Sequence, residues 1–163
     1  MSIDCPFCNI ASGQAPASIV YEDSTVLAFM DLNPANIGHT LVIPRKHWEN
    51  MYDIPEKTLT EMAPIVKRVC GAVKKTTGAE GITILQLNGK AAGQIVMHFH
   101  IHVIPRYSKD AISQGPGAMN ISRGVNKPNR GNLGSNGKKN TKTTLILTFV
   151  VGPAGFEPAI SSA

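Results

Sequence analysis

Short apolar stretches separated by turn-forming residues dominate the first part of the chain. Rich in β-branched and aromatic residues, the first three have the length and composition of β-strands. These stretches are residues 18–22, 25–30 and 38–44. Asp23 and Ser24 join the first two and predict a hairpin. Asn33 and Pro34 end the second, because proline lacks an amide hydrogen and restricts the residue before it.

Between residues 55 and 77 the apolar period changes to that of an α-helix. Side chains recur at i, i+3, i+4 and i+7 along one stripe. The stripe consists of Leu59, Met62, Val66, Val69, Cys70 and Val73. Pro55 suits the first turn and Gly78 suits the C-terminal cap, while Pro64 predicts a kink within the helix.

Two more apolar stretches follow the predicted helix. Residues 81–87 and 95–104 have the composition of strands, and residues 88–94 form the connection between them. Strands outnumber helices, and nothing repeats as a strand–helix–strand unit. The pattern therefore predicts an α+β domain with a mostly antiparallel sheet and one long helix.

The amino-acid composition of the chain changes after residue 107. Residues 113–140 are rich in Gly, Asn, Ser and Lys and predict a linker, and residues 144–151 resume as an isolated apolar, β-prone stretch. We therefore divide the chain into a catalytic domain at 1–107 and a basic tail at 108–163 that is disordered or atypical.

Charge supports the same division. The chain has 16 Lys and Arg against 11 Asp and Glu, a formal net charge of +5. Residues 1–107 carry nine of each sign, whereas residues 108–163 carry seven basic and two acidic residues. The basic character therefore belongs to the tail, and we expect no specific nucleic-acid partner for the domain.

The expected compartment is a reducing cytoplasm. The three cysteines are too few and too odd in number for a secreted disulfide framework; they are Cys5, Cys8 and Cys70. The first residues lack the pattern of a signal peptide, and the longest apolar run, 145–151, is far shorter than a membrane span. We expect no membrane partner.

Three histidines alternate with apolar residues near the end of the domain. On a strand, His98, His100 and His102 would share one face about 7 Å apart, while Phe99 and Ile101 would pack on the other. Such a row is costly as core alone, because buried imidazoles need partners and charged ones repel. Two chemistries fit: metal ligation by neutral rings, or nucleophilic and acid–base catalysis at phosphorus.

Further segments accompany the histidine row. In chain order they are Cys5-Pro-Phe-Cys8, Tyr21-Glu-Asp23, Ala28-Phe-Met-Asp31, Gly38-His-Thr-Leu-Val-Ile-Pro44, Lys46-His47, Asn88-Gly-Lys-Ala-Ala-Gly-Gln94 and Pro105-Arg106. With the row itself, they resemble the histidine triad (HIT) family, and most closely its bacterial-type Hint-like nucleotide-binding and hydrolase branch. The resemblance covers about residues 4–107. It implies an α+β fold and a homodimer in which the sheet extends across two subunits.

The resemblance implies a nucleotide hydrolase or nucleotidyl transferase that acts at the α-phosphorus of purine nucleotide phosphoramidates or related nucleotides. His100 would attack phosphorus and form a nucleotidyl-histidine intermediate, which water then hydrolyses. His98 and His102 would flank it, and His102 would contribute to α-phosphate binding. Gln94 would position the leaving group or the attacking water.

A nucleotide site is implied by the same resemblance. Asp31 would bind the ribose hydroxyls, and Asn88 would help to hold the phosphate loop, where backbone N–H groups near Gly93 are available. The base pocket would be lined by Phe7, Ile10, Phe29 and Leu32. Many relatives carry Ser or Thr directly after the Gly-Gln pair, whereas this chain has Ile95 and lacks that hydroxyl.

The Cys5-x-x-Cys8 pair raises the question of zinc. A structural zinc needs two more ligands, and His39, His47 and His98 are the candidates. The resemblance implies a site made of Cys5, Cys8, His47 and His98, with His39 beside the triad or simply at a strand end. The alternative is a pair of reduced free thiols and a surface His47.

Other interpretations stay open on sequence alone. The enzyme could be a dinucleoside polyphosphate hydrolase like those of the Fhit branch. The chain could instead be a nucleotide-binding module with vestigial catalysis, or a zinc-structured protein whose histidines are all ligands. These alternatives differ in whether a covalent intermediate forms on His100.

Overall fold

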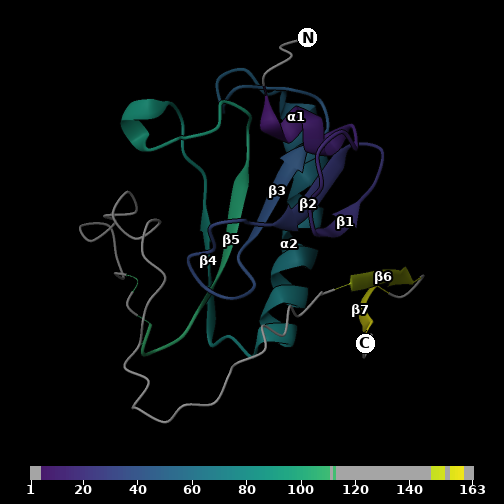
Figure 1. The fold of residues 1–163 in the computed structure, drawn as a ribbon, viewed down its shortest axis with the longest axis vertical. Helices are drawn as coiled ribbons and strands as arrows, with labels where there is room; N and C mark the ends of the chain where they lie inside the picture. Colours follow the sequence, from purple (N-terminus) through teal and green to yellow (C-terminus); the bar gives the residue numbers. More distant parts are fainter. Residues whose placement is uncertain (1–4, 111, 113–147, 153–154, 160–163) are drawn as a thin grey trace.

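A five-stranded antiparallel sheet forms the centre of the molecule (Figure 1). The computed structural model describes residues 5–110, 112, 148–152 and 155–159. The sheet order is β1-β2-β3-β5-β4, and its strands are β1 (Ile19–Glu22), β2 (Val26–Met30), β3 (Thr40–Pro44), β4 (Gly81–Leu85) and β5 (Ile101–Arg106). The α+β class and the antiparallel sheet are confirmed.

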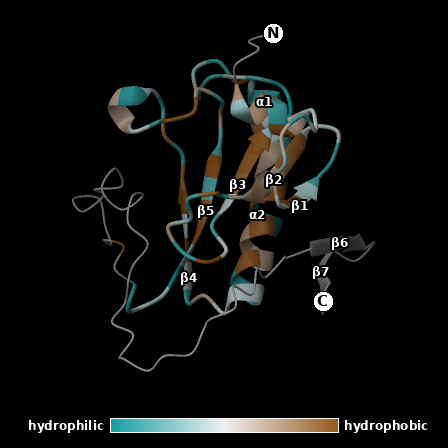
Figure 2. Ribbon diagram, in the orientation of Figure 1, coloured by the Kyte–Doolittle hydropathy of each residue, from teal (hydrophilic) through white to brown (hydrophobic). Residues whose placement is uncertain are grey.

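The long helix α2 (Glu56–Thr77) packs against one face of this sheet (Figure 1). Its apolar stripe, including Met62, Val69 and Val73, is buried against Val42 and Val103 from the sheet. Hydrophobic colour in Figure 2 follows the strands and this helix. The helix continues without a break through Pro64, and it ends where Gly78 takes a left-handed conformation at φ 66°.

The other face of the sheet is covered by a short helix, α1 (Pro6–Ala11). Phe7 from this helix is buried with Leu27, Phe29, Leu41 and Ile43 in a second apolar cluster. This helix was not predicted from the sequence, because six residues are too few for a visible helical period. The cluster fixes the N-terminal segment beside the histidine row.

The predicted strand at 95–104 is wrong in its first half. β5 begins only at Ile101, and a 3₁₀ turn at Lys90–Ala92 lies in the preceding loop. The backbone N–H of Phe99 donates to the carbonyl of Trp48 at 2.6 Å, outside the sheet ladder. His98 and His100 therefore lie on the approach to the strand, and only His102 lies within it.

The predicted linker at 113–140 lies outside the described residues. Beyond it, β6 (Thr148–Gly152) pairs with β7 (Gly155–Ala159) as a separate antiparallel two-stranded sheet, so the apolar stretch predicted as isolated has a partner. In the part of the chain that the structure describes, no helix has both the length and the apolar character needed to cross a membrane.

Candidate active site

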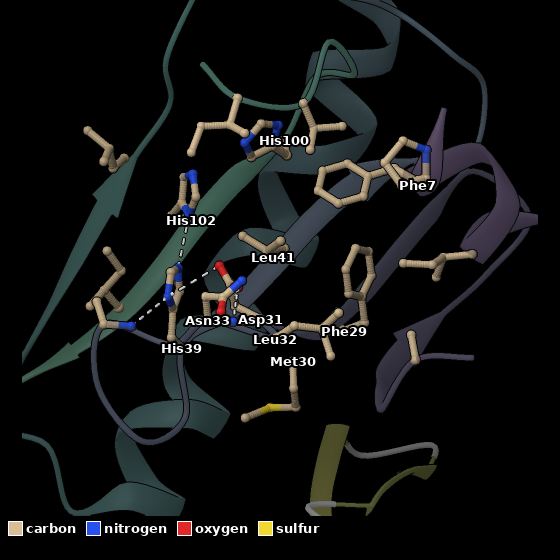
Figure 3. A pocket seen from close by; sticks show the side chains of 18 of the residues that line it. Phe7, Phe29, Met30, Asp31, Leu32, Asn33, His39, Leu41, His100 and His102 are labelled. Atoms are coloured by element: carbon tan, nitrogen blue, oxygen red, sulfur yellow. Dashed lines mark hydrogen bonds and ion pairs between the residues drawn. The ribbon is translucent and has the colours of Figure 1, made fainter. Parts of the chain in front are cut away.

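A pocket of about 320 Å³ opens on the α1 side of the sheet (Figure 3). Apolar side chains form most of its wall. Its polar side chains are Asp31, Asn33, His39, His100 and His102. Of the residues expected in a nucleotide site, Phe7, Ile10, Phe29, Leu32, Asp31 and Gly93 all line this pocket.

His98 faces away from the pocket and is fully buried. Its Nε2 lies 2.9 Å from the carbonyl oxygen of Pro44. Because a carbonyl only accepts, Nε2 carries the hydrogen and Nδ1 carries a lone pair. Burial is the main cause that lowers the pKa of His98 to about 4, so the ring is neutral at pH 7.

His100 is 5% exposed, and its orientation is set by its own backbone neighbour. Its Nδ1 donates to the carbonyl of His98 at 2.6 Å, which leaves the lone pair on Nε2. The Phe7 ring meets the imidazole edge-on at 5.3 Å between centroids. Burial lowers the pKa of His100, against the opposing effects of the His98 carbonyl and the Asp31 charge. The result is a neutral imidazole in the pocket wall, with the nitrogen suited to attack left unprotonated.

His102 is the inner end of a hydrogen-bonded chain that starts at the backbone of Ala35 (Figure 3). The N–H of Ala35 donates to His39 Nδ1 at 3.2 Å, so the hydrogen of neutral His39 lies on Nε2. That Nε2 donates to His102 Nδ1 at 2.9 Å. The hydrogen of neutral His102 is therefore on Nε2, where it serves as a donor.

Asp31 lies beside this chain. Its Oδ2 is 3.5 Å from His39 Nδ1, and its Oδ1 accepts from the backbone N–H of Asn33 at 2.8 Å. Burial is the largest cause that lowers the pKa of His39, which makes the ring neutral, so the contact with Asp31 is not an ion pair at neutral pH. The Asp31 carboxylate thus keeps acceptor capacity at the edge of the pocket.

The rings of His100 and His102 lie closer than a regular strand predicts. Their centroids are 4.9 Å apart, rather than about 7 Å, and the rings meet at 68°. Burial, as the largest cause, together with the nearby rings of His100 and His39 lowers the pKa of His102 to about 3. The two neighbours therefore present complementary groups, a lone pair on His100 and an N–H on His102.

Gln94 takes an inward position beneath the loop that carries Gly93. It is 3% exposed, and its Oε1 accepts from the N–H of Gly89 at 2.7 Å. Its Nε2 donates to the carbonyls of Glu49 and Val96 at 2.7 and 3.0 Å. In this arrangement the amide holds the loop in place, and it is not among the pocket-lining groups.

Asn88 also lies outside the pocket wall. Its Oδ1 accepts from the backbone N–H of Met51 at 2.8 Å, and its Nδ2 donates to Gln86 at 2.6 Å. The side chain therefore joins the loop after β4 to the segment after β3. The roles predicted for Asn88 and Gln94 in contact with a nucleotide stay predictions.

Four potential metal ligands, one of which is His98, lie close together outside the pocket. The Sγ–Nδ1 distances are 3.5 Å from Cys5 to His98, 3.6 Å from Cys8 to His98, and 3.3 Å from Cys8 to His47. One ligand atom from each residue lies within 4.8 Å of all the others. Tetrahedral zinc, with bonds of about 2.3 Å to sulfur and 2.0 Å to nitrogen, separates S and N ligands by about 3.5 Å. The residues present fit such an ion.

The sequence did not give His39 a definite role, although its position at the start of the third predicted strand could have indicated one. In the observed register, Leu41 is the partner of His102. This pairing brings His39, the residue just before β3, alongside the histidine row. The fixed carbonyls of Pro44 and His98 were also missed, because the residue type does not encode a backbone acceptor.

Comparison with known proteins identifies the family. The HIT domain family model matches residues 12–109. The chain belongs to the HIT family. An uncharacterized HIT-like protein of Methanocaldococcus jannaschii is 48% identical over 106 residues, which cover 65% of this chain and 81% of that protein. The crystal structure of a zinc-bound histidine triad family protein from Mycobacterium smegmatis is 42% identical, with a TM-score of 0.66 over 69% of this chain and 82% of that one.

Two further relatives of this HIT protein carry names that state an activity. Adenosine 5'-monophosphoramidase hnt1 of Schizosaccharomyces pombe is 36% identical over 108 residues, 66% of this chain and 78% of that protein. Adenylylsulfatase HINT3 of Arabidopsis thaliana is 38% identical over 109 residues, 67% of this chain and 55% of that protein. HIT family members thus include hydrolases.

We expect His102 to make the free energy of unfolding depend on pH. Its pKa is about 3 in the folded protein and about 6.5 in an unfolded chain, so the unfolded state takes up the proton first as the pH falls. The stability that neutral His102 contributes is therefore complete above about pH 6.5 and is lost as the pH falls toward 3.

The variant His102→Asn removes this titration while its amide oxygen still accepts from His39. In urea denaturation, the wild type should lose about 1–2 kcal/mol more stability than the variant between about pH 7 and pH 5. Equal losses in the two proteins would show that His102 is not held neutral.

Proposed function

We propose that this HIT protein is a nucleotide hydrolase or nucleotidyl transferase that acts at the α-phosphorus of purine nucleotide phosphoramidates or related nucleotides. The observation that carries the proposal is the state of His100, a neutral ring whose Nδ1 is bonded to the His98 carbonyl and whose Nε2 is left with the lone pair. An unprotonated nitrogen in an apolar, largely water-free wall is a competent nucleophile.

In the first step, the Nε2 lone pair of His100 forms a bond to the α-phosphorus, and the bond from phosphorus to the leaving nitrogen breaks. The electron pair of the broken bond stays on that nitrogen, which takes up a proton and leaves as an amine. In the second step, water attacks phosphorus, the P–Nε2 bond breaks, and one proton is released. The nucleoside monophosphate is the product, and His100 is regenerated.

The rest of the pocket supports binding of a nucleotide around this centre. The N–H on His102 Nε2 can donate to a phosphoryl oxygen, and the free acceptor capacity of Asp31 suits ribose hydroxyls. Phe7 and Phe29, which meet edge to face at 5.4 Å, supply an aromatic wall for a purine base. Among the described residues, His98 belongs to the cysteine cluster and His102 to a second group of potential ligands with Asp31 and His39, whereas His100 belongs to neither. This argues against a protein whose histidines are all metal ligands.

We also propose that Cys5, Cys8, His47 and His98 hold a structural zinc ion. The ion, when bound, would fix the N-terminal segment to the start of the histidine row. His98 would bind through Nδ1, and its Nε2–H bond to the Pro44 carbonyl would orient the ring, as outer partners of metal-bound histidines commonly do. Phe7, between the two cysteines, contacts both His98 and His100.

A homodimer is part of this proposal. β4 is an edge strand of the five-stranded sheet, and its Ile84 side chain is 57% exposed. An exposed edge with an apolar side chain favours addition of a strand or face from a second copy. Such pairing agrees with the sheet extension that the family resemblance implies.

The nucleophile assignment predicts that His100→Ala abolishes turnover while nucleotide binding is retained. The wild type should release AMP from adenosine 5'-phosphoramidate, and the variant should be slower by about 10³-fold or more in kcat. The matching control is the Kd of AMP for both proteins by calorimetry. A folded, AMP-binding variant with wild-type kcat would refute the assignment.

The zinc assignment predicts a metal content that depends on one cysteine and not on another. Cys8→Ser should lose the ion, whereas Cys70→Ser, which alters a thiol in α2 outside the cluster, should keep about one zinc per chain. Elemental analysis of the purified proteins measures this directly. Equal zinc contents in the two variants, or zinc absent from the wild type, would contradict the site.

A further inference from the structure

The loop between β2 and β3, residues 31–39, carries the hydrogen-bonded chain that ends at His102. Asp31 is at its start and His39 at its end, and the backbone N–H of Asp31 donates to the carbonyl of His39 at 3.0 Å. The dashed lines in Figure 3 mark the contacts of the His39 ring with the Ala35 N–H and with His102. The protonation of His102 therefore depends on how this β2–β3 loop is held.

Two groups compete for Nδ1 of His39. The Ala35 N–H, a donor, lies at 3.2 Å, and the Asp31 Oδ2, an acceptor, lies at 3.5 Å. With the donor in place, Nδ1 keeps its lone pair and the hydrogen on Nε2 is donated to His102 Nδ1. Without that donor, the Asp31 carboxylate would stabilise the hydrogen on Nδ1, and Nε2 would become an acceptor. His102 would then donate through Nδ1, and its Nε2 would no longer offer an N–H to the pocket.

Asn36 ties this loop to the end of β5. Its Nδ2 donates to the carbonyl of Pro105 at 2.8 Å and to Oδ2 of Asp110 at 3.1 Å. Its backbone carbonyl accepts from the His39 N–H at 3.0 Å. Asn36 thus fixes the turn that holds the neighbouring Ala35 N–H against the His39 ring.

Gly38 anchors the same loop a second time. Its φ is 94°, and a Cβ at this position would lie 2.5 Å from Cγ2 of Thr77 and 3.2 Å from Cγ of Pro105. The backbone therefore packs directly on the ends of α2 and β5. Because this contact does not involve Asn36, we expect the loop to keep its course when the Asn36 bonds are removed.

Asp110 is a fixed charged acceptor for Asn36. Its side chain is 6% exposed, and Arg106 donates to both carboxylate oxygens at 2.8 Å, with a further bond of 2.9 Å from the Tyr107 N–H. The Arg106 guanidinium is the main cause that holds the pKa of Asp110 far below its usual range, so the group is a carboxylate at neutral pH. A bond to a charged acceptor is stronger than one to a neutral acceptor.

We propose that Asp110 and Asn36 form a clamp that sets the tautomer of His102 through the β2–β3 loop. Neither residue lines the pocket, so both are positioning residues. The inference rests on the proposed function in one respect, the use of the His102 Nε2–H as a donor to a phosphoryl oxygen. Asp110 lies beyond residue 107, where the composition of the chain ends the domain, and the clamp makes it part of the active-site framework.

The test measures the His102 tautomer in the ligand-free full chain at pH 7 by long-range ¹H–¹⁵N correlation. The wild type should carry the hydrogen on Nε2, and Asn36→Ala and Asp110→Ala should each lower the ratio of the Nε2–H to the Nδ1–H form by about fivefold or more. Glu80→Ala is the matched control. Glu80 accepts from the N–H and the hydroxyl of Ser108, close to Asp110 in the chain, and this variant should keep the wild-type spectrum.

A His102 spectrum that the two clamp variants leave unchanged would overturn the clamp, as would a wild type with the hydrogen on Nδ1. A lower Tm with an unchanged spectrum would show a structural role only. If Asp110→Ala fails to fold, Asn36→Ala decides alone, because it leaves the pair of Arg106 and Asp110 intact.

The spectra contain no nucleotide, so they are independent of the proposed function. Turnover of adenosine 5'-phosphoramidate by the wild type tests that function separately. Altered spectra together with wild-type release of AMP support both proposals. Altered spectra without any release of AMP leave the clamp standing and refute the proposed function, whereas unchanged spectra with release of AMP refute the clamp alone.

Discussion

Each histidine of the triad has one ring nitrogen bonded to a fixed partner, and the chemistry of the site depends on this constraint. His98 donates to the Pro44 carbonyl, His100 donates to the His98 carbonyl, and His102 accepts from His39. A neutral imidazole has one hydrogen, so a fixed partner on one nitrogen determines the state of the other. Burial, which disfavours the charged form, keeps all three rings neutral.

The same constraint divides the row between two tasks. His98 directs its lone pair at the two cysteines, and His100 keeps its lone pair for the pocket. The two sites are connected, because the carbonyl that orients His100 belongs to His98, and Phe7 packs against both rings. An ion held by the cysteine cluster would therefore support the geometry of the nucleophile without taking part in the reaction.

The sequence predicted the fold class, the five strands and the long helix, because alternation and the 3.6-residue period report burial directly. The family resemblance grouped Cys5, Cys8, His47 and His98, whose potential ligand atoms the structure places within 4.8 Å of one another. It failed where long-range backbone contacts override local pattern. The bond from Phe99 to Trp48 delays the start of β5, and the inward amide of Gln94 depends on carbonyls from distant segments. The backbone carbonyls that accept these hydrogen bonds come from other segments, so the residue types around Gln94 and Phe99 do not reveal them.

The central claim, that His100 is neutral with its hydrogen on Nδ1, can be measured directly. Long-range ¹H–¹⁵N correlation spectra of protein labelled at histidine distinguish the two neutral tautomers and the charged ring. At pH 7 we expect His100 to show a protonated Nδ1 and an unprotonated Nε2, and His102 to show the reverse. A His100 ring protonated on Nε2, in either the neutral or the charged form, would contradict it.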